Sequence, residues 1–94
     1  MRLDKFLKTA RILKRREAAK ELALQGRVQV NGRPAKPSAE VKENDEIEMR
    51  FGNRLLCVKV LELRKQVSKA DAALLFEVIR EEKINEPETA AENQ

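Results

Sequence analysis

The chain has 94 residues, of which 38% are charged and 41% hydrophobic, and its formal net charge is +4. This length allows one small domain. It has no His and one cysteine, Cys57, which excludes Ser–His and Cys–His catalytic pairs, an internal disulfide and the commonest zinc ligand. The sequence contains no run of about 18 apolar residues, the length that a membrane-spanning helix needs, and we expect no secretory signal. These features favour a cytoplasmic, non-enzymatic binding module without cofactor or metal.

The first quarter of the chain predicts two amphipathic helices. The first spans about residues 3–10, and its apolar stripe consists of Leu3, Phe6, Leu7 and Ala10. The second spans about residues 15–24, and its apolar side consists of Ala18, Ala19, Leu22 and Ala23. Gly26 follows at the place where a helix commonly ends in a left-handed residue.

The middle of the chain predicts strands. Residues 27–30 alternate polar and apolar, and Asn31-Gly32 is the strongest short signal for a type I′ hairpin turn. Prolines keep the return arm over residues 33–36 short or at a sheet edge. Residues 45–51 form a clear strand whose apolar residues face one way. Residues 54–63 form another strand. Its apolar residues lie on both faces, so we expect it to be covered on more than one side.

The pattern changes again from Ser68 onward. The apolar spacing returns to a helical period with Ala72, Leu75, Phe76 and Ile79. Ser68 is a plausible N-cap, with Asp71 in the position of a capping box. We therefore predict an α+β domain over residues 1–64, a C-terminal helix packed on it over residues 65–84, and a disordered acidic tail over residues 85–94.

The modest net charge conceals a strongly basic N-terminal third. Residues 1–36 hold eleven basic and three acidic residues, a net charge of +8, and the remainder carries −4. This concentration indicates a polyanionic partner, with nucleic acid as the leading interpretation. A basic but merely solvated helical surface is the alternative. A membrane surface is less favoured because the apolar helix faces are committed to a core.

The basic run Lys14-Arg15-Arg16 stands at the entrance to the second helix, where the helix dipole opposes each cation by about 0.3–1 kcal/mol. A phosphate there would be bound by the side chains and by the free amides of the first turn. Alternatively, Glu17 offsets the dipole and the cations are only solvated. Asp4, the one acid in the first basic helix, is expected to orient Arg2 or Arg16.

The hairpin adds basic groups beside a turn. Asn31 either contacts nucleic acid or is present because the turn needs a positive φ. The candidate nucleic-acid-binding residues are Arg2, Asp4, Lys5, Lys8, Arg11, Lys14, Arg15, Arg16, Lys20, Arg27, Asn31, Arg33 and Lys36.

The composition also limits the kind of nucleic acid. The chain has no Trp, no Tyr and three Phe, so stacking on bases cannot be the main mode of binding. This favours a folded RNA recognised by its shape and phosphates. Two other classes stay open: a protein-interaction module that uses the predicted C-terminal helix, and a DNA-binding helix-turn-helix.

Four segments resemble the S-four RNA-binding domain, which is named after a protein of the small ribosomal subunit. They are residues 2–7 (RLDKFL), 14–18 (KRREA), 25–32 (QGRVQVNG) and 41–47 (VKENDEI). The resemblance covers about residues 1–61, and Asn44 replaces a frequent glycine. It implies an alpha-L fold, in which two helices lie on a small, mainly antiparallel sheet, and RNA binding through the helices and the hairpin.

Two bacterial groups of stand-alone S-four proteins are similar to this chain. One is the RqcP group of ribosome-associated quality control, and residues 49–52 (MRFG), residues 77–83 and the acidic tail resemble it more. The other is the heat-shock ribosome-binding group, which acts on dissociated large subunits. A general ribosome-assembly role is a further alternative.

The RqcP resemblance implies a monomer that binds large ribosomal subunits carrying peptidyl-tRNA. It would contact large-subunit rRNA and the P-site tRNA, and would support alanine tailing with a partner that recruits alanyl-tRNA. Arg2, Asp4 and Arg16 fall at motif positions that the resemblance assigns to the RNA contact.

Overall fold

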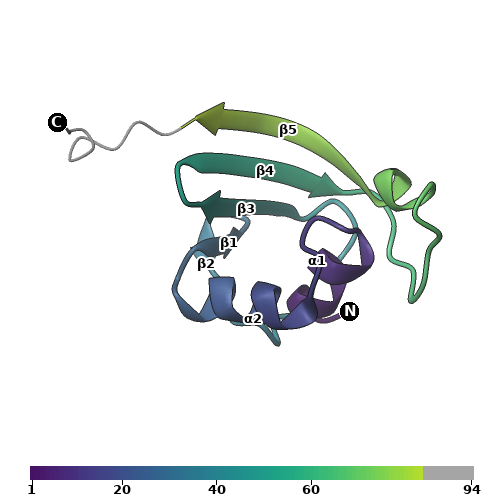
Figure 1. The fold of residues 1–94 in the computed structure, drawn as a ribbon, viewed down its shortest axis with the longest axis horizontal. Helices are drawn as coiled ribbons and strands as arrows, with labels where there is room; N and C mark the ends of the chain where they lie inside the picture. Colours follow the sequence, from purple (N-terminus) through teal and green to yellow (C-terminus); the bar gives the residue numbers. More distant parts are fainter. Residues whose placement is uncertain (84–94) are drawn as a thin grey trace, which may run out of the picture.

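The computed structural model describes residues 1–83, so the predicted acidic tail lies outside the described residues. Two α-helices precede a sheet, and a short 3₁₀ helix, η1, precedes the last strand (Figure 1). The elements are α1 (Leu3–Thr9), α2 (Arg16–Leu24), β1 (Val28–Val30), β2 (Arg33–Pro34), β3 (Glu46–Phe51), β4 (Arg54–Val60), η1 (Ala72–Leu75) and β5 (Phe76–Lys83). Through β4, each predicted element is present, and its ends lie within three residues of the predicted ones.

The strands form one antiparallel sheet in the order β2-β1-β3-β4-β5. The hairpin of β3 and β4 runs in regular register from the pair Glu46–Lys59 to the pair Phe51–Arg54. The helices lie at the β1 and β3 side of the sheet, and β5 lies farthest from α2 (Figure 1). This two-helix and antiparallel-sheet architecture confirms the predicted α+β class for the first part of the chain.

Both helices bury apolar side chains as the spacing predicts, but α2 does so over a narrower face. Leu3, Phe6 and Leu7 in α1 are fully buried. In α2 the small residues Ala19 and Ala23 are buried, whereas Ala18, which was expected on the apolar side, is exposed. The small buried residues allow α2 to pack directly against α1.

The hairpin turn has the predicted type I′ conformation. Asn31 and Gly32 have φ angles of 53° and 84°, and positive values at both central residues define this turn. Gly26 ends α2 in a left-handed conformation, with φ at 75°. Pro34 lies in β2, at the edge of the sheet, where its missing N–H costs no ladder hydrogen bond.

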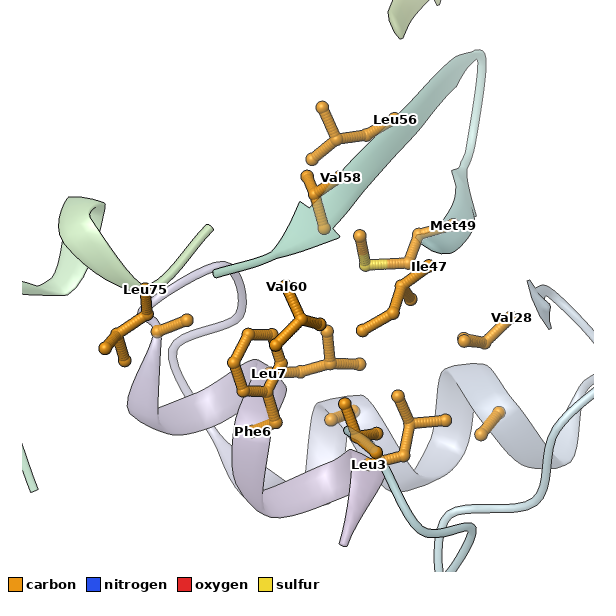
Figure 2. Close-up of a cluster of buried hydrophobic side chains, with 14 residues drawn as sticks. Leu3, Phe6, Leu7, Val28, Ile47, Met49, Leu56, Val58, Val60 and Leu75 are labelled. Atoms are coloured by element: carbon orange, nitrogen blue, oxygen red, sulfur yellow. The ribbon is translucent and has the colours of Figure 1, made fainter. Parts of the chain in front are cut away.

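The core lies between the helices and the inner face of the sheet (Figure 2). Ile47 and Met49 of β3 and Val58 and Val60 of β4 alternate with exposed or half-buried residues, as strands with one buried face do. Figure 2 shows Phe6 of α1 and Val60 of β4 in this cluster. This core holds α1 and α2 against the sheet, so their basic residues lie on the outer surface.

The predicted C-terminal helix is wrong. Within residues 65–83, only Ala72–Leu75 forms a helical turn, of the 3₁₀ type, and Phe76–Lys83 is a strand paired along β4. The predicted cap interaction is present in part, because the backbone N–H of Asp71 donates to Oγ of Ser68 at 3.2 Å. The turn that Ser68 stabilises ends at η1 instead of continuing.

A β-bulge explains the misleading pattern. Val58 pairs with Val78 and Cys57 pairs with Arg80, so Ile79 has no partner in the register. The extra residue breaks the period of two that identifies a strand. Together with the preceding 3₁₀ turn, this extra residue gives the apolar residues from Ala72 to Ile79 a spacing that matches a helix. Pairing with the edge of β4 nevertheless makes this segment a strand from Phe76 onward.

Candidate nucleic-acid interface

The centre of the basic surface is Asp4, whose carboxylate accepts hydrogen bonds from two arginines. Arg2 donates from Nε to Oδ1 and from Nη2 to Oδ2, both at 3.3 Å, and Arg16 donates from Nη2 to Oδ1 at 3.4 Å. The Asp4 side chain is 3% exposed, whereas those of Arg2 and Arg16 are 50% and 47% exposed. Asp4 was expected to orient one of these arginines, and it orients both.

The charge of Asp4 follows from these contacts. Burial raises the pKa of the carboxyl, but hydrogen bonds and charge interactions with Arg16 and Arg2 together lower it more, so the pKa lies below its usual value. Asp4 is therefore ionised at neutral pH. Because one carboxylate faces two guanidinium groups, the cluster keeps a positive charge, and each exposed guanidinium keeps N–H donors for a ligand.

The first turn of α1 is held in place by the segment before β3. The backbone N–H groups of Leu3 and Asp4 donate to the carbonyl oxygens of Ala39 and Pro37, at 2.8 and 3.0 Å. Arg2 forms an isolated antiparallel bridge with Glu40. These backbone bonds fix the positions of Arg2 and Asp4. The hydrogen bond from Arg16, the first residue of α2 and twelve residues after Asp4, then joins them to α2.

Two adjoining hollows extend from this cluster. An open hollow of about 300 Å³ is lined by Arg2, Asp4, Arg16, Glu17 and Lys20. A second hollow of about 460 Å³ is lined by Arg2, Lys20, Ala23, Leu24, Lys36, Pro37 and Ser38. The two share Arg2 and Lys20, and we call them together the basic groove. Its cations are Arg2, Arg16, Lys20 and Lys36.

The other predicted cations lie outside this groove. Lys14 and Arg15 are exposed just before α2, whose first turn has no side-chain cap, and Lys5 is half-buried. Arg33 is exposed on β2. The remaining three lie in separate hollows, Arg27 in one, and Lys8 and Arg11 in another. The fold thus brings together only part of the predicted set.

Asn31 has a structural role that accounts for its side chain. Its Nδ2 donates to Oδ1 of Asp45 at 3.0 Å, and its Oδ1 accepts from the backbone N–H of Glu46 at 3.0 Å. Its positive φ also suits an asparagine. The amide group therefore joins the hairpin turn to the start of β3. This favours a role of Asn31 in the turn over a contact with nucleic acid.

Sequence reasoning missed part of the groove wall. Leu24 is 66% exposed in the last turn of α2, and its position off the apolar stripe was an available signal. Ser38 belongs to none of the predicted elements, and no local pattern marks it as a groove residue. Arg50 was assigned correctly to the polar side of its strand, but its place beside Arg27 in a hollow of about 690 Å³ depends on the register of β1 and β3.

A metal-ligating cluster, a membrane-spanning helix and a reactive cysteine are three other features that could carry a function. Residues 1–83 have no group of three or more His, Cys, Asp or Glu side chains placed to hold a metal ion, and no helix in this range is long and apolar enough to cross a membrane. Cys57 is half-buried in β4, and burial, with Glu46 and Glu48 nearby, raises the pKa of its thiol. The thiol is therefore protonated at neutral pH, a poor state for a nucleophile.

Comparison with known proteins identifies the family. The S4 domain model matches residues 1–47. The RQC P-site tRNA stabilizing factor of Streptococcus pneumoniae is 55% identical over 86 residues, which cover 92% of this chain and 98% of that protein. The protein of the same name from Bacillus subtilis is 50% identical over 86 residues, which cover 92% of this chain and all of that protein.

A solved structure places the fold in the same family. Heat Shock Protein 15 of Vibrio cholerae, described as trimeric, matches with a TM-score of 0.77 and 32% identity, over 83% of this chain and 80% of that one. Both stand-alone groups that the motifs indicated are therefore among the relatives, and similarity is higher to the quality-control group. The chain belongs to the S4-domain family and, within it, to the group of the RQC P-site tRNA stabilizing factors.

Proposed function

We propose that this chain is a non-enzymatic RNA-binding factor of ribosome-associated quality control. It binds large ribosomal subunits that carry peptidyl-tRNA, contacts the large-subunit rRNA and the P-site tRNA, and stabilises that tRNA. With a partner protein that recruits alanyl-tRNA, it supports alanine tailing of the nascent chain. The names of the relatives support the tRNA role, and the basic groove supports the contact with RNA.

The observation that carries the proposal is the ion cluster of Asp4, Arg2 and Arg16. Fixing a guanidinium before a ligand arrives reduces the entropy lost on binding. Here two guanidinium groups are held by one buried carboxylate and remain about half exposed. Each can therefore donate to a phosphate in a planar, two-pronged arrangement. Lys20 and Lys36 extend the same groove as mobile point charges.

The shape of the groove suits folded RNA better than single-stranded bases. Within residues 1–83 its lining contains no aromatic side chain on which a base could stack. Its donors are guanidinium and ammonium groups, which bind phosphate oxygens irrespective of sequence. Recognition would therefore follow the spacing of phosphates on a structured RNA.

A complementation experiment tests the role in cells. Nascent chains are purified from a strain that lacks this protein, and their alanine tails are quantified. We expect the tails to be lost in that strain, restored by the wild-type protein, and not restored by Arg16→Ala. The matched control is Lys59→Gln, which removes one positive charge from β4, between the core residues Val58 and Val60, and should restore tailing. Normal tails in the deletion strain would refute the proposal.

The similarity to Heat Shock Protein 15 favours one second candidate, a factor that recycles large subunits. Both candidates bind subunits carrying peptidyl-tRNA, so tailing distinguishes them. A recycling factor would leave alanine tails intact in the deletion strain, while subunits with trapped peptidyl-tRNA accumulate. Equal binding to empty subunits would instead indicate a general ribosome-assembly factor.

A further inference from the structure

A second basic hollow lies at the other end of α1 from the Asp4 cluster. It measures about 270 Å³ and is lined by Lys8, Thr9, Arg11, Lys65, Gln66 and Val67. It shares no lining residue with the basic groove, and no carboxylate lines it. Its cations come from two segments far apart in sequence, the end of α1 and the loop between β4 and η1.

The backbone of Arg11 gives the first reason to assign this hollow a function. Arg11 follows the C-cap residue Ala10 and has a φ of 58°, a left-handed conformation. Its N–H donates to the carbonyl of Lys8, which closes the helix end. Glycine is the residue that suits such a position, and a side chain there is strained. The backbone therefore opposes arginine, and the exposed guanidinium is the feature that can explain its presence.

The loop that supplies Lys65 is anchored on both sides. Leu63 and Val67 pack against the core cluster, so the residues between them are held beside the end of α1. This loop descends from the end of β4 before η1 (Figure 1). Arg64 pairs with Glu62 at 2.7 Å, so the acid that is closest to Lys65 in the sequence of the loop already has a partner. The position of Lys65 thus follows from packing.

The three cations have no internal counter-charge. Among residues 1–83, none of Lys8, Arg11 and Lys65 forms an ion pair, although seven ion pairs occur elsewhere in that range. The helix dipole favours Lys8 in the last turn of α1, but it accounts for neither a strained arginine beyond that turn nor a lysine from another segment. Converging cations around an open hollow are the surroundings that a phosphate requires.

We propose that Lys8, Arg11 and Lys65 form a second phosphate-binding site, which takes a backbone phosphate of RNA outside the basic groove. The inference rests on the proposed function, because it extends the RNA contact from the N-terminal end of α1 to its C-terminal end and to the following loop. It adds Lys65, which lies outside the basic N-terminal third, to the binding surface.

The experiment uses Arg11→Gly, which removes the cation and relieves the backbone strain in one change. Affinity for purified large subunits carrying peptidyl-tRNA is measured across a salt series, and Tm is measured in parallel. We expect binding about fivefold weaker, a slope of log affinity against log salt smaller by about one, and a Tm that is unchanged or higher. Lys65→Gln should weaken binding to a similar extent with an unchanged Tm. The control Lys59→Gln should change neither the affinity nor the Tm.

The outcomes separate this inference from the proposed function. One outcome refutes the second site and keeps the basic groove. In it the wild-type protein binds and Arg16→Ala weakens that binding, but Arg11→Gly and Lys65→Gln bind as well as the control Lys59→Gln. If the wild-type protein shows no salt-dependent binding to the subunits, the proposed function itself fails. A weaker-binding Arg11→Gly variant with a lowered Tm would refute the claim that arginine strains the backbone, and Lys65→Gln would then decide the site alone.

Discussion

Asp4 loses nearly all contact with solvent, and a buried carboxylate is tolerated only when it is paired. Arg2 and Arg16 provide the pairing, yet each remains about half in solvent. The interaction therefore has two effects at the residue scale. It stabilises the junction of α1 and α2, and it holds two guanidinium groups in the lining of the basic groove.

Replacement of Asp4 tests both effects. Asp4→Asn keeps the shape of the side chain but removes the charge that orients the arginines. We expect the free energy of unfolding to fall by about 1–2 kcal/mol, because the lost hydrogen bonds are charge-assisted but their partners are screened by solvent. We also expect weaker binding to large subunits. Urea unfolding and co-sedimentation measure the two, and unchanged affinity would show that orientation by Asp4 does not matter.

The lowered pKa of Asp4 predicts a pH dependence. A carboxyl whose pKa is lower in the folded than in the unfolded chain stabilises the fold above its unfolded value and loses this contribution as the pH falls through the folded value. The contribution of Asp4 should therefore be complete above its ordinary value of 3.8 and decline in more acidic solution. The difference in unfolding free energy between wild type and Asp4→Asn isolates it, and a difference independent of pH would contradict the pairing.

At the scale of elements, the hairpin turn shows why a sequence motif needs a structural reading. Asn31 and Gly32 both have positive φ, and the Asn31 amide joins the turn to Asp45 and Glu46. The same residues belong to the motif that resembles an RNA-binding family. The motif is therefore informative about the fold at this position, and the hydrogen bonds of Asn31 explain its presence without a contact with RNA.

Asn31→Ala tests this division. The variant loses two side-chain hydrogen bonds and places alanine in a left-handed conformation, so we expect a loss of about 1–2 kcal/mol in unfolding stability. The affinity of the folded protein for large subunits should stay the same. Thermal unfolding and binding below Tm measure the two quantities. Weaker binding without loss of stability would return Asn31 to the RNA interface.

Much of the fold was predictable because local signals and tertiary structure agree through β4. The stripe of α1, the end of α2 at Gly26 and the alternation of β3 each follow from short-range chemistry. The last strand was not predictable in this way, since the unpaired residue Ile79 removes its alternation. Its structure depends on the open edge of β4, which is a non-local partner that sequence spacing does not contain.

The short helix η1 anchors this last strand, and two adjacent leucines test the arrangement. Leu75 is fully buried and Leu74 is 53% exposed. Leu75→Ala should lower the unfolding free energy by about 2–5 kcal/mol, because it leaves a cavity in the core. Leu74→Ala should change it by less than about 0.5 kcal/mol. Similar values for both variants in urea unfolding would contradict the position of η1.

On the scale of the whole molecule, the charge asymmetry was visible in the sequence, but its division into surfaces was not. The expected pairing of Asp4 with an arginine was correct, and the groove formed with Lys36 required the return of the chain past Pro37. Lys65 could not be assigned from local sequence, because only the path from β4 to η1 brings it to α1. Charge counts therefore indicated a polyanionic partner, and the fold decides which cations lie together.

Co-sedimentation with purified large ribosomal subunits, with and without peptidyl-tRNA and across a salt series, shows whether phosphate contacts hold this protein on the subunit. If phosphate contacts dominate, and about five are made, log affinity should fall against log salt with a slope of roughly −4 to −5. Binding should be tighter to subunits that carry peptidyl-tRNA, and Arg16→Ala should weaken it. A flat salt response, or binding unaffected by Arg16→Ala, would contradict the account.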